Sequence, residues 1–209
     1  MSNKSIGLVG ALAIAIFFVT GSALVPILPV VYAESEGPIN AVSFRSSSAG
    51  VAWSNWSDAK TSDDQRATVS LNDGQNSQTL NAVNFDFNIP SDAIITGVLV
   101  EIEKSAATAD RIKDNTVRLI VSSRSTGDNK ALDEFWGTTD EYSSYGGEDD
   151  TWGVNLTPSI VNSNTFGVGI SAIKPGDEDA GVQARVDHIR MTVYYFIAEH
   201  QGPNAPANA

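Results

Sequence analysis

The chain of 209 residues contains no cysteine, which excludes disulfides, thiol nucleophiles and cysteine-ligated metal sites. Its formal net charge is -12, from 13 Lys and Arg against 25 Asp and Glu. A surface this acidic repels phosphate backbones, so we expect no nucleic-acid partner. A β-domain of this length buries about 70% of the surface that its unfolded chain exposes, so it needs no metal to fold.

The first 33 residues have the features of a signal peptide. Lys4 provides a positive charge, and an almost wholly apolar run follows it as far as Val31. Val31 and Ala33 are compact side chains at the -3 and -1 positions of a signal-peptidase site, with cleavage before Glu34. The sequence therefore predicts removal of residues 1–33, no stable membrane span, and a secreted protein in the extracellular space or on the cell surface.

A retained membrane anchor is the alternative for this segment, because about 20 apolar residues span a bilayer. Pro26 and Pro29 favour cleavage, since they break a helix next to the site where the peptidase needs extended chain.

The domain is predicted over residues 39–198, after a polar lead at residues 34–38 and before a disordered tail at residues 199–209. Within the domain, short runs alternate apolar and polar residues and end at Gly, Pro, Asn or Asp, as β-strands do. The predicted strands cover residues 39–44, 67–71, 83–89, 94–104, 116–122, 131–136, 152–154, 166–172 and 182–197.

The connections between these strands are polar. Residues 46–64 and 138–150 are predicted as loops, and Thr157, which precedes a proline, predicts a single helical turn. In the strand at residues 94–104, the alternation places Glu101 and Glu103 toward water.

The last strand alternates in two phases. Its inward parity changes at Asp187 and His188, which predicts an extra residue at that point, as in a β-bulge or a sheet corner. We interpret this pair as polar groups that satisfy backbone atoms freed by the bulge, rather than as a catalytic pair.

Together the eight or nine strands and the lack of a long helical period predict an all-β fold. One-sided alternation favours a two-sheet antiparallel β-sandwich, and long connections favour jelly-roll or Greek-key topology.

Several short phrases in the domain carry a resemblance to a known type of module. They lie at residues 89–93, 95–98, 100–102, 114–117, 127–131, 136, 145–147, 152–153, 166–168, 185–189 and 193–195. Between Trp53 and Tyr195 the chain resembles a widespread secreted or virion-type β-sandwich module of prokaryotic surface proteins and phage structural proteins. With its signal peptide, it also resembles the secreted subunits of archaeal donor-strand filaments. Both resemblances imply a structural or adhesive role and no catalytic residue.

Acidic clusters in the loops suggest a calcium site, since Ca²⁺ takes six to eight oxygen ligands from flexible loops. The predicted ligands are Asp149, Asp150 and Asp177, and the alternative is that these acids are simply solvated. No other cofactor is expected.

Aromatic residues in the predicted loops suggest a glycan-binding surface, because exposed rings stack on sugar faces. The candidates are Trp53, Trp56, Trp136, Trp152 and Tyr145. The alternative is that these rings plug the loops onto the ends of the core.

Two sequons, at Asn55 and Asn155, are candidate N-glycosylation sites.

The leading functional hypothesis is a secreted cell-surface structural or interaction protein, and not an enzyme. In its most specific form the chain is a filament subunit, in which the strand at residues 39–44 completes the sheet of a neighbouring copy. Partners would then be further copies of the chain or other surface proteins. The alternative is a carbohydrate-binding or adhesion module that uses the loop aromatics, with or without calcium.

Overall fold

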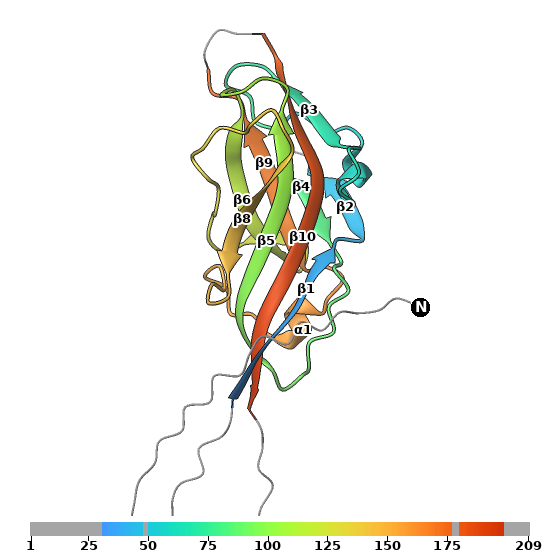
Figure 1. Ribbon diagram of the computed structural model, residues 1–209, viewed down its shortest axis with the longest axis vertical. Helices are drawn as coiled ribbons and strands as arrows, with labels where there is room; N and C mark the ends of the chain where they lie inside the picture. The colour runs from blue at the N-terminus through green and yellow to red at the C-terminus, as the bar shows by residue number, and fades with distance from the viewer. Residues whose placement is uncertain (1–30, 48–49, 177–179, 199–209) are drawn as a thin grey trace, which may run out of the picture.

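The computed structural model describes residues 31–47, 50–176 and 180–198 (Figure 1). The predictions for residues 1–30, for Asp177 and for the tail after Ala198 lie outside the described residues. Within the described ranges, no helix is long and apolar enough to span a bilayer.

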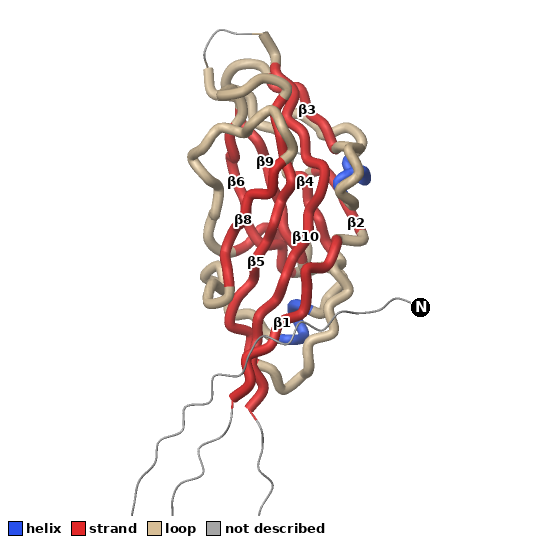
Figure 2. Tube along the Cα trace, viewed as in Figure 1, coloured by secondary structure: helices blue, strands red, loops and turns tan. Residues whose placement is uncertain are grey.

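In the part of the chain that the structure describes, ten strands form two antiparallel sheets of five strands each, which confirms the predicted all-β sandwich (Figure 2). The front sheet contains β1 (Val31–Asn40), β3 (Ala67–Leu71), β5 (Ile94–Ala106), β8 (Glu141–Gly147) and β10 (Val182–Ala198). The back sheet contains β2 (Ser43–Ser46), β4 (Leu80–Val83), β6 (Lys113–Val121), β7 (Arg124–Thr126) and β9 (Gly167–Ile173). A 3-10 helix, η1 (Trp56–Ala59), and one helical turn, α1 (Pro158–Val161), complete the described elements.

The strand pairing is that of a jelly roll. β3 pairs with β10, β4 with β9, β5 with β8 and β6 with β7, all antiparallel. This nested pairing arises when one long hairpin rolls up so that its pairs fall alternately into two sheets. The topology is therefore the jelly-roll form of the two that the sequence left open.

The core lies between the sheets and is filled by the inward parity of the strands. In β5, Val98, Val100 and Ile102 are fully buried, as predicted. The predicted strand at residues 83–89 keeps its alternation but leaves the β4 ladder after Val83. Asn84 and Asp86 have positive φ angles there, which interrupt the ladder, while the intervening aromatic side chains remain buried.

Three predicted elements in the middle of the chain are wrong. Residues 138–150, predicted as a loop, contain β8, in which only Tyr145 is buried, so the strand has no alternation to detect. Residues 131–136 and 152–154 are predicted as short strands. Trp136 and Trp152 are buried, but no strand is formed by either segment.

The N-terminal strand also differs from the prediction. Residues 34–38, predicted as a polar lead, lie inside β1, which pairs with β10 from Val31↔Ala198 to Asn40↔Arg190. The predicted strand at residues 39–44 is divided: its first two residues end β1, and its last two begin β2 in the other sheet.

The predicted bulge in β10 is confirmed. Val186 pairs with Lys104 and His188 with Glu103, so Asp187 is the extra residue. The bulge lets both phases of the alternation point inward. The inward residues are Val182, Ala184, Val186, Ile189, Met191 and Val193.

Candidate functional site on the outer face of the front sheet

The bulge lies at a gap in the edge of the front sheet. β3 pairs with β10 up to Val186, and β1 pairs with β10 from Arg190 onward. Between them, a single bridge joins His188 to Lys60, in the loop that follows η1. Asp187 and its neighbour therefore face an edge that a loop covers instead of a strand.

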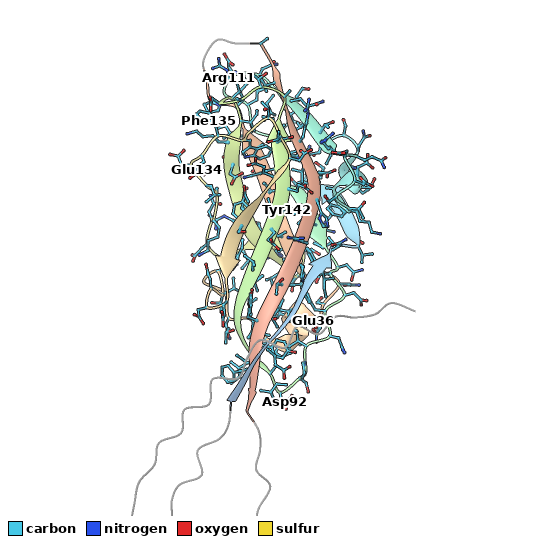
Figure 3. All side chains as sticks on the ribbon, in the orientation of Figure 1. Glu36, Asp92, Arg111, Glu134, Phe135 and Tyr142 are labelled. Carbon is cyan, nitrogen blue, oxygen red and sulfur yellow. The ribbon has the colours of Figure 1, made fainter. Side chains whose placement is uncertain are left out.

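A row of polar side chains crosses three strands at this level. His188 on β10 is opposite Glu103 on β5, which is opposite Tyr142 on β8. The hydroxyl of Tyr142 lies 2.7 Å from Nδ1 of His188, and the two rings meet edge to face. Figure 3 shows Tyr142 on the exposed side of this sheet.

The next row is an ion pair. Arg190 donates two hydrogen bonds to Glu101, both of 2.9 Å, and its guanidinium lies 4.2 Å from the ring centre of Tyr142. Glu101 and Glu103 lie on the outer face of the sheet, as predicted, but both are half-buried among charged and aromatic neighbours.

Three aspartates from distant parts of the chain meet beside the bulge. Carboxylate oxygens of Asp64, Asp140 and Asp187 lie within 4.8 Å of one another. Arg66 reaches Asp64 at 2.8 Å and Asp140 at 2.5 Å, and Ser105 donates to Asp140 at 2.6 Å. We call this set, with Glu103, Tyr142 and His188, the bulge cluster.

The bulge cluster leaves buried polar atoms without partners. Among the residues that the structure describes, three buried side-chain atoms make no hydrogen bond: Oε2 of Glu103, Oδ1 of Asp187 and Nε2 of His188. Buried polar atoms are normally paired, so three unpaired atoms at one place call for a partner outside the chain, such as water or an ion.

The surroundings in the bulge cluster raise the pKa of Asp187 and lower the pKa of His188. Burial, with the charges of Glu103 and Asp140, raises the pKa of Asp187 from 3.8 to about 6, against a backbone hydrogen bond from Asp64. Burial, and then the charge of Arg190, lowers the pKa of His188.

The predicted role for the pair at the bulge needs correction. Asp187 accepts a 3.4 Å hydrogen bond from the backbone of Asp64, which belongs to the covering loop and not to the bulged ladder. His188 contacts a tyrosine side chain. The phase change at Asp187 was readable in the sequence, but nothing there indicated that this residue meets Asp64, and Asp140 carried no signal.

The aromatic residues predicted to bind glycans are mostly buried. Trp53, Trp136, Trp152 and Tyr145 are each at most 4% exposed, so they cannot present a face to a sugar. Their polar atoms bind the protein itself, as when Trp152 donates to the carbonyl of Val98. The three tryptophans among them plug loops onto the core, which was the alternative interpretation, and Tyr145 packs into the core from strand β8. Trp56, 42% exposed, differs from the other four.

The predicted calcium ligands are not brought into one described cluster. Asp149 is exposed, and Asp177 lies outside the described residues. Asp150 binds Lys130 at 2.7 Å and the backbone of Trp152 at 2.8 Å. Although burial opposes it, the hydrogen bond from Lys130 lowers the pKa of Asp150, so this carboxylate stabilises a turn.

Both sequon asparagines, Asn55 and Asn155, are exposed, and their glycosylation stays a prediction.

A second polar cluster lies inside the sandwich and joins the two sheets. Lys104 of β5 pairs with Asp114 of β6 at 2.6 Å. The same carboxylate accepts hydrogen bonds from Trp136, Tyr145 and the backbone of Leu132, at 2.8, 2.8 and 3.0 Å. Burial lowers the pKa of Lys104 against the opposing effect of Asp114. We call these four side chains, without Leu132, the inter-sheet cluster.

A hollow of about 530 Å³ opens over the back sheet. Its lining carries hydroxyl and amide groups without a formal charge. The lining residues are Gly50, Val51, Gln75, Asn76, Ser77, Thr79, Asn115, Thr116 and Ser171.

Comparison with known proteins gives structural likeness only. No protein-family model matches the chain, and no curated protein matches it. The capsid asymmetric unit of cyanophage Pam1 is similar at 15% identity and a TM-score of 0.29, covering 88% of this chain and 94% of that one. Two structures of infectious bursal disease virus, of the Gx and Gt strains, are similar at 14% and 13% identity, with TM-scores of 0.26 and 0.27. In both, the likeness covers 88% of this chain, which spans 38% of the viral chain. At these scores the likenesses support no conclusion about function.

Proposed function

We propose that this chain is a structural protein of the cell exterior that associates with further copies by exchanging strand β1. The predicted signal peptide supports the compartment. The observation that carries the exchange is the way β1 is held: it is attached to β10 by a backbone ladder, and none of its residues from Ala33 to Asn40 is buried.

Strand exchange would preserve the backbone ladder that holds β1. A β1 from another copy would form the same ladder with β10 and leave no edge unpaired. In Figure 1, β1 and the end of β10 extend together beyond the rest of the sandwich, where a second chain has access. Cleavage before Glu34 would leave the pairs from Glu34↔Tyr195 to Asn40↔Arg190 available for exchange.

The lack of native cysteine allows a direct test by disulfide trapping. Ser35 and Tyr194 are paired directly, and side chains at paired positions lie close enough for a disulfide. We expect the secreted Ser35→Cys/Tyr194→Cys variant to give covalent dimers and longer ladders on non-reducing gels. Intramolecular disulfides alone, at all protein concentrations, would contradict the proposal.

A matched control uses the neighbouring strand. Arg45 on β2 pairs with Asn81 on β4, in the other sheet. If β1 alone is exchanged, the Arg45→Cys/Asn81→Cys variant forms only intramolecular disulfides. Covalent ladders in both variants would instead indicate exchange of a longer segment that includes residues 43–46.

Carbohydrate binding is supported by a different feature from the one predicted. The hollow over the back sheet offers hydroxyls and amides, which match the hydroxyls of a sugar. A glycan array with the wild type and with an Asn115→Ala variant tests this second function, and the absence of any wild-type binding would remove it.

A further inference from the structure

The bulge cluster has an excess of negative charge. Three carboxylates, of Asp64, Asp140 and Asp187, converge within 4.8 Å, and the guanidinium of Arg66 contacts two of them. Taken with Arg66, these groups carry a net charge of about -2 when all three acids are ionised. Glu103, opposite the residue that follows Asp187, adds a further negative charge.

A second observation, independent of the charge count, indicates a missing ligand. Asp187 is 98% buried, at 2% exposure, and its Oδ1 atom has no hydrogen-bond partner among the described residues. Leaving a buried charged acceptor unpaired is costly, so an unpaired atom in a native fold calls for an explanation. Its carboxylate belongs to the converging set, so a cation held there would provide the partner.

The ligand chemistry is that of a hard divalent cation. The converging atoms are all carboxylate oxygens, which suit calcium and not the softer metals that prefer sulfur. Asp64 is exposed, so water can complete the six to eight ligands that calcium takes. The three aspartates come from a loop, from the residue before β8 and from the bulge, which gives the flexibility that calcium tolerates.

We propose that Asp64, Asp140 and Asp187 bind a calcium ion beside the β10 bulge. The ion would lie near the gap between β1 and β3 and would attach the covering loop to the front sheet. Arg66, whose side chain is 27% exposed, occupies this place in part and would turn toward solvent when calcium binds. The site is distinct from the acidic loop at Asp149 and Asp150.

Isothermal titration calorimetry on the full chain, freed of metal with EDTA and titrated with calcium chloride, tests the site. We expect one saturable binding event per chain and a higher melting temperature with calcium. Asp187→Asn should weaken binding by about tenfold or more, because even outer groups of metal sites contribute that much. Asp64→Asn, at an exposed position, should weaken binding without affecting folding.

Two controls make the result decisive. Asp149→Asn removes an exposed acid outside the cluster and should leave the calcium affinity unchanged. Arg66→Gln removes the competing charge and should raise the affinity. The proposal is overturned if the wild type shows no saturable heat up to millimolar calcium. It is equally overturned if Asp149→Asn weakens binding as much as Asp64→Asn does.

Discussion

Strand β5 contributes to two polar clusters, one inside the sandwich and one outside it. The two differ in how completely their polar atoms are hydrogen-bonded. Lys104 and Glu103 are adjacent on β5 and point to opposite faces of the front sheet. Inside, Lys104 meets a carboxylate that has four donors. Outside, Glu103, Asp187 and His188 each retain an unpaired atom.

The difference follows from where the polar groups of each cluster can find hydrogen-bond partners and opposite charges. Between the sheets, an unpaired charge has no access to water, so the inter-sheet cluster must be complete within the chain. At the gap beside β10, an exposed residue such as Asp64 connects the cluster to solvent, and a ligand can supply what the chain does not. The inner cluster is therefore structural, and the outer one can be functional.

The largest expected effect comes from breaking the inter-sheet cluster. Asp114→Ala would leave Lys104 buried without its counterion, which costs about 3–5 kcal/mol of unfolding free energy. Urea denaturation followed by tryptophan fluorescence measures the loss. As a control, the double replacement Lys104→Met/Asp114→Asn should recover part of it, because no charge remains buried and the amide oxygen still accepts a hydrogen bond from the donors around it. A cost below about 1 kcal/mol for Asp114→Ala would show that the inner cluster is not closed to water.

The next effect separates the hydrogen bonds of the inner cluster from its charges. Trp136→Phe removes the indole donor to Asp114 and should cost about 2 kcal/mol. The same measurement on Trp56→Phe, at an exposed position, should fall within about 0.5 kcal/mol of wild type. Equal costs at the two positions would contradict the assignment of Trp136 to the inter-sheet cluster.

The stability that Asp187 of the outer cluster contributes should fall as the pH rises, whereas a carboxylate with a lowered pKa contributes more stability at higher pH. The pKa of Asp187 is about 6 in the folded chain against an ordinary 3.8, so the folded state holds this proton more tightly. Its contribution to stability is therefore present below about pH 4 and is lost as the pH rises to about 6. In EDTA, Asp187→Asn should be more stable than wild type by about 1–2 kcal/mol at pH 7, with no gain at pH 4. Denaturation midpoints at the two pH values measure this, and an Asp187→Asn variant less stable at pH 7 would contradict it.

The smallest effect belongs to the ion pair at the solvent side of the outer cluster. Arg190 and Glu101 have side chains that are 29% and 20% exposed, so water already screens their attraction. A double-mutant cycle with Glu101→Gln and Arg190→Gln should give a coupling energy of about 0.5–1 kcal/mol that decreases in high salt. A coupling as large as that expected for Lys104 and Asp114 would remove the contrast between the two faces.

The local sequence pattern was sufficient to predict a strand where one face of that strand is buried. The parity of Val98, Val100 and Ile102 and the phase change at Asp187 were readable, because strand side chains alternate with a period of two and a bulge must shift that period. The same logic failed for β8, which buries Tyr145 alone, and for Trp136 and Trp152, whose apolar surface is buried from loops.

The sequence by itself determined an all-β sandwich, the parity of its main strands and the bulge in its last one, since each depends on residues close in the chain. Only the tertiary structure decided which rings were buried and which acids met. Asp64, Asp140 and Asp187 are separated by more than forty residues at each step, and the rolled pairing of the jelly roll places them within 4.8 Å. Their proximity depends on the path of strands β3, β8 and β10, and no local pattern encodes that path.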